Sequence, residues 1–211
     1  MAASPEQPGP AGLLPLLDGA PEEVAPRLLG AVLRHGEVAL RLTEVEAYAG
    51  EDDPGSHAYR GPTPRTEVMF GPAGRLYTYF SYGMHVCANV VVGHEGRAAA
   101  VLLRAGEVVE GHDVARARRP RSSERDLTRG PARLCQALAI TLEHGGSDLV
   151  AGPVTLEPGP APEHWESGPR VGLRGAPERP WRFWLPGEPS VSTYRPAAAR
   201  PAPSTGPGGR R

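Results

Sequence analysis

An acidic side chain at the end of a strand-like segment is the first candidate for chemistry in this sequence. Apolar side chains alternate at Val38, Leu40 and Leu42, and the same parity continues to Glu46 and Tyr48. Alternate residues of a β-strand face the same side, so Glu46 is predicted to point into apolar surroundings unless a bulge resets the register. A carboxylate placed there costs free energy and is typical of a functional group. A strand that ends earlier and leaves the carboxylate in solvent is the open alternative.

The stretch that follows carries further candidates for the wall of a pocket. Most of them are embedded in small or apolar segments rather than in polar ones. Together they predict a cavity with aromatic walls and few polar groups. For each tyrosine alone, packing in the core is the alternative interpretation, and we favour it for Tyr77. The candidates are His57, Tyr77, Tyr79, Tyr82, Asn89 and Arg104.

Length and composition predict one domain with a hydrophobic core. The chain has 211 residues, of which 39% are hydrophobic, enough for one domain but not for two. We expect this domain at 13–195, between disordered tails rich in proline and glycine at 1–12 and 196–211. No apolar run approaches membrane-spanning length and no secretion signal precedes the domain, so we expect a soluble cytoplasmic protein.

The residue types exclude several classes of enzyme. All 23 basic side chains are arginine, which excludes a lysine Schiff base and a Walker-type phosphate loop. No G-x-S-x-G or G-x-G-x-x-G motif supports a serine hydrolase or a dinucleotide-binding protein. Cys87 and Cys135 lie in apolar runs without zinc-ligand spacing, so they are predicted to be buried thiols in a reducing compartment.

Charge is unevenly distributed although the net charge is only −1. The segment 116–133 contains seven arginines against Glu124 and Asp126, whereas the first 57 residues contain ten acids and three arginines. Such a basic segment is suited to local contact with a polyanion. A solvated helix end and loop is the alternative interpretation.

Helical and strand-like patterns alternate without a regular βαβ rhythm. We therefore predict an α/β fold, a single irregular mixed domain with a mainly antiparallel curved β-sheet flanked by helices. The expected helices cover 21–33, 107–119 and a segment from 130 to about 142 that begins at Gly130-Pro131. The expected strands cover 38–46, 75–82, 86–92, 98–104, 154–156 and 181–185, with a loop at 161–169.

The order and spacing of many short motifs are similar to one known family. Over 14–192 the sequence resembles the alkyladenine (3-methyladenine) DNA glycosylase family. It departs from the usual pattern at His85, where an aromatic residue is common, and in its arginine-rich segment. The matching motifs are EVEAY (44–48), SHA (56–58), TPR (63–65), MF (69–70), GRLYTY (74–79), YGM (82–84), NV (89–90), VLLRA (101–105), GP (130–131), LCQAL (134–138) and PRVG (169–172).

The resemblance implies hydrolysis of the N-glycosidic bond of damaged purines, without a metal or other cofactor. The expected partner is double-stranded DNA containing such a purine, bound by a monomer. The damaged nucleotide must leave the base stack to be reached, and damage weakens the pairing that opposes this. Tyr82 matches the family's wedge and would fill the gap in the stack.

The resemblance also implies a role for each pocket residue. Tyr48, His57 and Tyr79 match the residues that sandwich the extruded base, whose positive charge in many alkylated purines would favour aromatic faces. Asn89 matches a residue that crowds the exocyclic amine of guanine.

The implied catalytic group is Glu46, which would act as general base on a water aimed at the sugar C1′. Arg104 would hold this water and Glu46, and the backbone at Val171 would supply another water contact. Without lysine, the enzyme is predicted to leave an intact abasic site. The sequence does not rank 3-methyladenine, 7-methylguanine, hypoxanthine and etheno-adenine as substrates.

Two hypotheses from other functional classes are also compatible with the sequence. The first is a non-catalytic module that recognises modified bases in the same pocket. The second is a metal-dependent nuclease that uses Glu51, Asp52, Asp53 and His57, although their spacing matches no recognised metal site.

Overall fold

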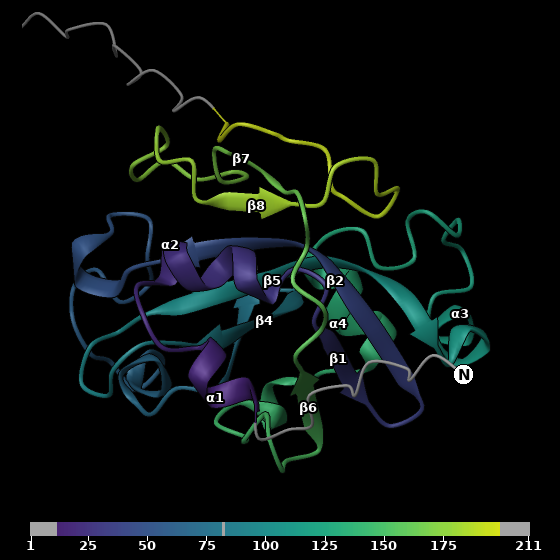
Figure 1. Ribbon diagram of the computed structural model, residues 1–211, viewed down its shortest axis with the longest axis horizontal. Helices are drawn as coiled ribbons and strands as arrows, with labels where there is room; N and C mark the ends of the chain where they lie inside the picture. The colour runs from purple at the N-terminus through teal and green to yellow at the C-terminus, as the bar shows by residue number, and fades with distance from the viewer. Residues whose placement is uncertain (1–11, 82, 199–211) are drawn as a thin grey trace, which may run out of the picture.

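A curled antiparallel sheet forms the centre of the computed structural model, which describes residues 12–81 and 83–198 (Figure 1). Six strands follow the order β3-β4-β5-β2-β1-β6, and β8 pairs with β2 and with β7. The predicted class of fold, a mixed single domain with a curved antiparallel sheet, is confirmed. The strands are β1 (Val32–His35), β2 (Val38–Tyr48), β3 (Leu76–Ser81), β4 (His85–Val91), β5 (Ala100–Glu110), β6 (Val154–Glu157), β7 (Glu166–Gly168) and β8 (Arg182–Trp184).

Short helices surround the sheet. The longest is α4, whose buried side chains Leu134, Cys135, Ala137 and Leu138 join the main hydrophobic core. Both cysteines are buried and free, as predicted. No helix in the described part of the chain is long and apolar enough to cross a membrane. The α-helices are α1 (Leu13–Leu16), α2 (Pro21–Val24), α3 (His112–Arg118) and α4 (Pro131–Leu138); the 3₁₀ turns are Ala25–Leu28, Gly50–Asp52, Glu67–Phe70 and Leu142–His144.

Irregular pairing between β2 and β5 decides which side chains reach the site. The register shifts twice between Leu42 and Val45, as it does at a β-bulge. Leu42 and Val45 therefore both belong to the core, whereas Glu44 and Glu46 face the opposite side of the sheet. The simple parity argument for Glu46 was wrong, because the bulge resets the register. The predicted burial of Glu46 is nevertheless correct, since its exposed fraction is 0%.

The helix predicted at 21–33 was wrong in its second half. Helical structure ends with the 3₁₀ turn Ala25–Leu28, and β1 occupies Val32–His35. Leu29 has an extended backbone and Gly30 a φ of 85°, a conformation that favours glycine and ends the helix. The apolar residues beyond Gly30 belong to a strand.

Three other boundaries differ from the prediction. The segment 107–110 continues β5, and the chain turns only at Gly111, where a side chain would place a Cβ 2.1 Å from the Glu37 carbonyl oxygen. Helix α4 ends at Leu138 because Ala139 is left-handed, which leaves Leu142 outside the helix. The predicted loop 161–169 contains β7. Residues 1–11 and 199–211 of the predicted tails lie outside the described residues.

Truncation of the core should be far more costly than truncation at the surface of the same strand. We expect Leu103→Ala in β5 to lower the free energy of unfolding by about 2–5 kcal/mol, because it leaves a cavity in the core. The matched control, Val109→Ala, removes a side chain that is 46% exposed and should cost less than about 1 kcal/mol. Urea unfolding followed by circular dichroism measures both; equal losses would contradict this placement of the core.

Candidate active site

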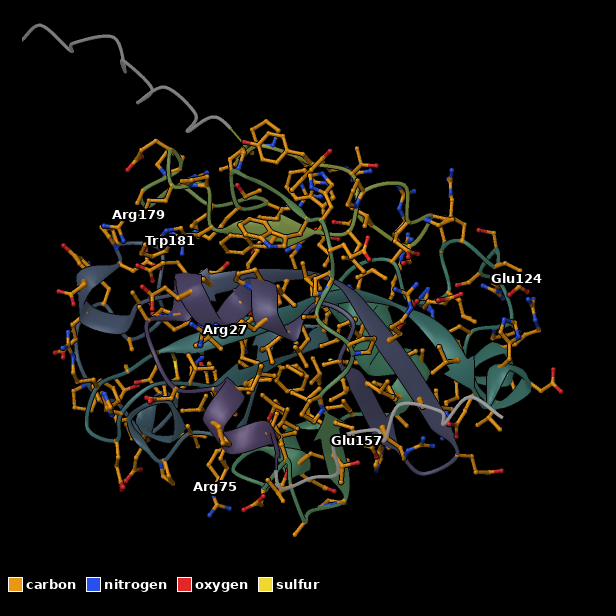
Figure 2. The ribbon with its side chains drawn as sticks, in the orientation of Figure 1. Arg27, Arg75, Glu124, Glu157, Arg179 and Trp181 are labelled. Atoms are coloured by element: carbon orange, nitrogen blue, oxygen red, sulfur yellow. The ribbon has the colours of Figure 1, made fainter. Side chains whose placement is uncertain are left out.

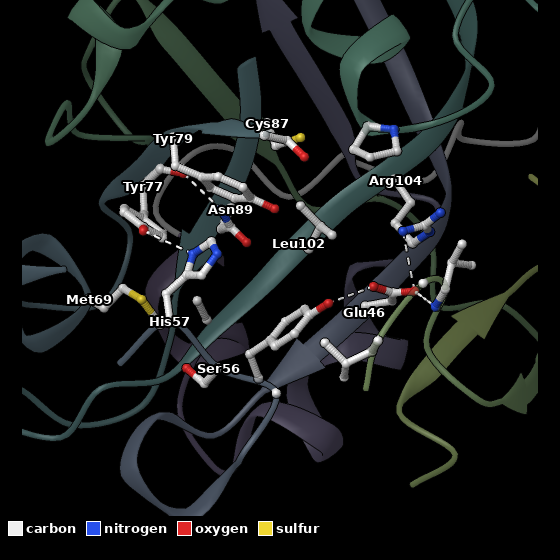
Figure 3. Close-up of a pocket in the computed structure, with 18 of the residues that line it drawn as sticks. Glu46, Ser56, His57, Met69, Tyr77, Tyr79, Cys87, Asn89, Leu102 and Arg104 are labelled. Atoms are coloured by element: carbon white, nitrogen blue, oxygen red, sulfur yellow. Dashed lines mark hydrogen bonds and ion pairs between the residues drawn. The ribbon is translucent and has the colours of Figure 1, made fainter. Parts of the chain in front are cut away.

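One face of four adjacent strands supplies the floor and walls of a cavity of about 530 Å³. Each strand contributes at least one pair of side chains spaced by two residues, as expected for residues on the same face. In Figure 3, Glu46 and Arg104 lie at one end of this cavity, and His57, Tyr77 and Tyr79 lie at the other. The pairs are Tyr77 and Tyr79 on β3, Cys87 and Asn89 on β4, Leu102 and Arg104 on β5, and Glu46 and Tyr48 on β2.

The Glu46 carboxylate is fully buried and receives three donors. Its Oε2 accepts a hydrogen bond of 2.8 Å from the Tyr48 hydroxyl, and its Oε1 accepts one of 2.7 Å from the Val171 amide. The Arg104 guanidinium forms an ion pair at 3.3 Å with Oε1. Burial, followed by the charge of Glu46, raises the pKa of Tyr48 well above its ordinary value, so this phenol remains a donor.

A second buried carboxylate, Glu44, holds Arg104 in place. Its Oε1 accepts hydrogen bonds from Arg104 Nε at 2.8 Å and from Arg182 Nε at 2.6 Å, and its Oε2 accepts one from the Ser192 amide at 2.6 Å. Burial acts to lower the pKa of Arg104, but the charges of Glu46 and Glu44 outweigh it and raise that pKa. Arg104 therefore remains a cation between the two carboxylates.

A buried ion pair between Asp53 and Arg170 fixes the loop that carries Val171. Arg170 Nη2 donates to Asp53 Oδ1 at 2.7 Å and Nη1 donates to Asp53 Oδ2, and both side chains are fully buried. Arg170 Nη1 also donates to the Ala47 carbonyl at 2.9 Å, and its guanidinium carbon lies 4.6 Å from the centre of the Tyr48 ring. Arg170 thus positions both the Tyr48 ring, which lines the cavity, and the neighbouring Val171 amide, which donates to Glu46.

Close backbone packing supports the same loop. A Cβ at Gly175 would lie 2.3 Å from the carbonyl oxygen of Pro54, and a Cβ at Gly55 would lie 2.4 Å from the Leu173 side chain. Glycine at both positions lets the loop after β2 and the loop around Arg170 approach each other closely.

The far end of the cavity is aromatic and uncharged apart from Arg65 at its rim. The His57 ring lies edge-on to Tyr79 at 4.5 Å between centroids and is hydrogen bonded to the Tyr77 hydroxyl at 3.2 Å. Burial, and then the charge of Arg65, lowers the pKa of His57 to about 4, so His57 is neutral near pH 7. The Asn89 amide donates to the Tyr77 carbonyl at 3.0 Å.

The structure brings together seven of the eight site residues predicted from the sequence. The eighth, Tyr82, lies outside the described residues. The roles of the Glu44, Asp53, Arg170 and Arg182 side chains were not predicted from the sequence, although the spacing of Glu44 and Glu46 was a signal that could have been used. The seven are Glu46, Tyr48, His57, Tyr79, Asn89, Arg104 and Val171.

The residues of the nuclease hypothesis are not arranged to hold a metal ion. Glu51 and Asp52 are exposed, Asp53 is paired with Arg170, and His57 lies in the aromatic end of the cavity. Among residues 12–81 and 83–198, no three His, Cys, Asp or Glu side chains form a group that could bind a metal.

Comparison of the sequence with known proteins identifies the family of this chain. The family model described as methylpurine-DNA glycosylase (MPG) matches residues 16–189. The chain belongs to this family. Membership confirms the resemblance found in the motifs and supports a role as a DNA glycosylase, a hydrolase of N-glycosidic bonds.

Bacterial proteins align over most of this chain. The chain is 59% identical over 187 residues to a protein of Leifsonia xyli subsp. xyli. This alignment covers 82% of this chain and 87% of that protein. It is 56% identical over 186 residues to a protein of Frankia casuarinae, with 82% and 88% covered, and 53% identical over 195 residues to one of Nocardia farcinica, with 88% and 92% covered. All three carry the name "Putative 3-methyladenine DNA glycosylase".

Removal of the Asp53 charge should destabilise the protein in a pH-dependent way. We expect Asp53→Asn to lower the free energy of unfolding at pH 7 by about 3–5 kcal/mol, because Arg170 then stays buried without its partner. Burial acts to raise the pKa of Asp53, but hydrogen bonds from Arg170 and Gly55 lower it below its ordinary value. The wild-type advantage is therefore complete above about pH 4 and is lost as the pH falls through the lowered pKa.

Unfolding experiments at pH 7 and pH 3 measure this effect. The neighbouring Asp52 is the matched control, because its side chain is 77% exposed and its partner Arg97 is 79% exposed. Asp52→Asn should change the free energy of unfolding by less than about 1 kcal/mol. A difference between wild type and Asp53→Asn that stays the same at both pH values would contradict the prediction.

Proposed function

We propose that this protein is a monofunctional DNA glycosylase that extrudes a damaged purine from double-stranded DNA and hydrolyses its N-glycosidic bond. The observation that supports this most strongly is the buried Glu46 carboxylate at one end of a cavity whose other end is aromatic (Figure 3). An extruded nucleotide has the same two parts, a flat base and a sugar whose C1′ is the reacting atom. The substrate class is alkylated or deaminated purines, including 3-methyladenine, 7-methylguanine, hypoxanthine and etheno-adenine.

The aromatic end of the cavity would hold the base. Tyr48 would stack on one side of the purine, with His57 and Tyr79 on the other. Base–aromatic stacking contributes about 1–3 kcal/mol per base, enough to offset a large part of the cost of leaving the duplex. Neutral His57 adds no charge that would repel a cationic base. Asn89, whose amide is fixed by Tyr77, would crowd the amine of an undamaged guanine.

Glu46 would act as general base at the other end. As the C1′–N bond lengthens, its electron pair leaves with the base and the sugar gains oxocarbenium character, which the carboxylate stabilises. The water oxygen then bonds to C1′ while its proton passes to Glu46. Arg104 and the Val171 backbone, which already contact Glu46 Oε1, would orient this water and the carboxylate.

The remaining parts of the proposal concern the DNA. Tyr82, which follows β3 in the sequence, would insert into the stack at the place of the extruded nucleotide. A monomer with one cavity suits one lesion on one duplex, and action on the chromosome would place the enzyme at the nucleoid. The product would be an intact abasic site.

Substitution of Glu46 should abolish catalysis with little effect on recognition. We expect Glu46→Gln to lower single-turnover release of hypoxanthine from duplex DNA by at least about 10²-fold, because the amide does not accept the proton of water. The exposed Glu51→Gln is the matched control and should retain wild-type activity. EDTA is present throughout. Base release by Glu46→Gln at the wild-type rate would refute the assignment; absence of release by wild type from hypoxanthine, etheno-adenine and methylated DNA, with tight binding, would favour the non-catalytic module.

Because the chain contains no lysine, we expect it to excise the base without cutting the DNA strand. Glycosylases that also cut the strand form a Schiff base with an amine, and every basic side chain here is arginine. We expect product strands to break only after alkali treatment. Denaturing gel electrophoresis with and without alkali, and trapping with borohydride, test this. Strand breaks without alkali, or a trapped covalent complex, would contradict the monofunctional assignment.

A further inference from the structure

The arginine-rich segment 116–133 has no part in the proposed reaction, and its charges are unevenly neutralised. Its two acids pair with four of its seven arginines. Glu124, on the loop after α3, projects at the edge of the molecule (Figure 2) and pairs with Arg116. Asp126 pairs with the other three, which are Arg133 at 3.3 Å, Arg129 at 3.7 Å and Arg125 at 3.9 Å.

The three remaining arginines, Arg118, Arg119 and Arg121, gather around one hollow. Within the part of the chain that the structure describes, none of them forms an ion pair with a carboxylate. They line an open hollow of about 550 Å³ together with Ser122 and Gln136, and no acidic residue lines it. The positive charge that the segment leaves uncompensated is thus concentrated at one place.

Arg119 has donors that the protein does not use. Its Nη2 donates to the Ser122 hydroxyl at 2.7 Å, whereas Nε and Nη1 are buried without a hydrogen-bond partner among the described residues. Unsatisfied buried donors are rare and costly, more so on a charged group. Burial, and then the charge of Arg133, lowers the pKa of Arg119 although Asp126 opposes this. After a small rotation of the Arg119 guanidinium, an anion in the hollow would accept hydrogen bonds from these donors. It would also supply the negative charge with which Arg119 is not paired in the described residues.

The hollow and the candidate active site are both lined by residues of α4. Pro131, at the start of α4, lines the cavity of Glu46, and Gln136, on the same helix, lines the hollow. Five residues of an α-helix rise about 7.5 Å along its axis. The two linings are thus little more than one helical turn apart along α4, so a DNA strand that delivers a nucleotide to the cavity would pass near the three arginines.

We propose that Arg118, Arg119 and Arg121 form a subsite for a backbone phosphate of duplex DNA that flanks the damaged nucleotide. This inference rests on the proposed function, because it takes DNA as the substrate. Guanidinium groups bind phosphate oxygens through paired hydrogen bonds, and Ser122 and Gln136 provide further donors. The subsite reads no base, so it raises affinity for all duplexes alike and holds the enzyme in register while the nucleotide rotates.

The salt dependence of DNA binding tests the proposal. The double variant Arg119→Gln/Arg121→Gln removes two of the charges, while Arg118 is kept because it donates to the Ala137 carbonyl at the end of α4. The probe is a labelled duplex with one non-hydrolysable abasic analogue. Each lost phosphate contact lowers the magnitude of the slope of log K against log salt by about 0.9, so the double variant, which loses one phosphate contact, should lose about 1 unit of slope. Its affinity should fall several-fold at low salt and converge on wild type at high salt.

Arg125→Gln is the matched control, because it removes the same charge from the same segment but lies beside Asp126, away from the hollow. It should keep the wild-type slope. Unchanged slope in the double variant would overturn the proposal, and so would an equal loss in Arg125→Gln, which would indicate a diffuse basic surface. If the double variant does not fold, the single variant Arg121→Gln, at an exposed position, tests the proposal, and its salt slope should fall by up to about 1 unit. Base release by wild type is scored separately, and its absence would refute the proposed function while leaving the comparison of slopes valid.

Discussion

Burial of carboxylate charge is the constraint on which this structure depends. Glu44, Glu46 and Asp53 are all fully buried. Removal of one such ion from water costs several kcal/mol, which only close positive charges and hydrogen-bond donors offset. The chain meets this need with Arg104 on β5, Arg170 in a loop and Arg182 on β8, together with backbone amides. Each carboxylate thereby fixes the position of an arginine as much as the arginine fixes the carboxylate.

This constraint explains why segments far apart in the sequence must come together. The site begins on β2, but the donors that make Glu46 tolerable lie on β5 and at Val171, and those for Glu44 include Arg182 and Ser192. The strands β7 and β8 and the segments around them therefore complete the electrostatics of the site, in addition to the side chain of Phe183 that β8 contributes to the hydrophobic core. Without them, an ionised Glu46 would remain at the sheet surface without its amide donor.

The sequence predicted the class of fold, most strands and the residues that line the cavity, because strand periodicity and the family motifs both depend on local order. It did not predict the bulge after Leu42, since parity counting assumes regular pairing. The helix predicted from the sequence continued beyond Gly30, because the apolar residues of β1 have the same spacing as the apolar stripe of a helix. The pairing of Arg170 with Asp53 connects positions 117 residues apart, and nothing local marks an arginine for burial.

In the proposed reaction, Glu46 faces the C1′ of an extruded purine nucleotide held in the aromatic end of the cavity. A crystal structure of the Glu46→Gln variant bound to a duplex with one hypoxanthine would test this arrangement. We expect the base between Tyr48 and the rings of His57 and Tyr79, with C1′ one water away from residue 46. A hypoxanthine that remains stacked in the duplex, or that enters the cavity with its sugar turned away from residue 46, would contradict it.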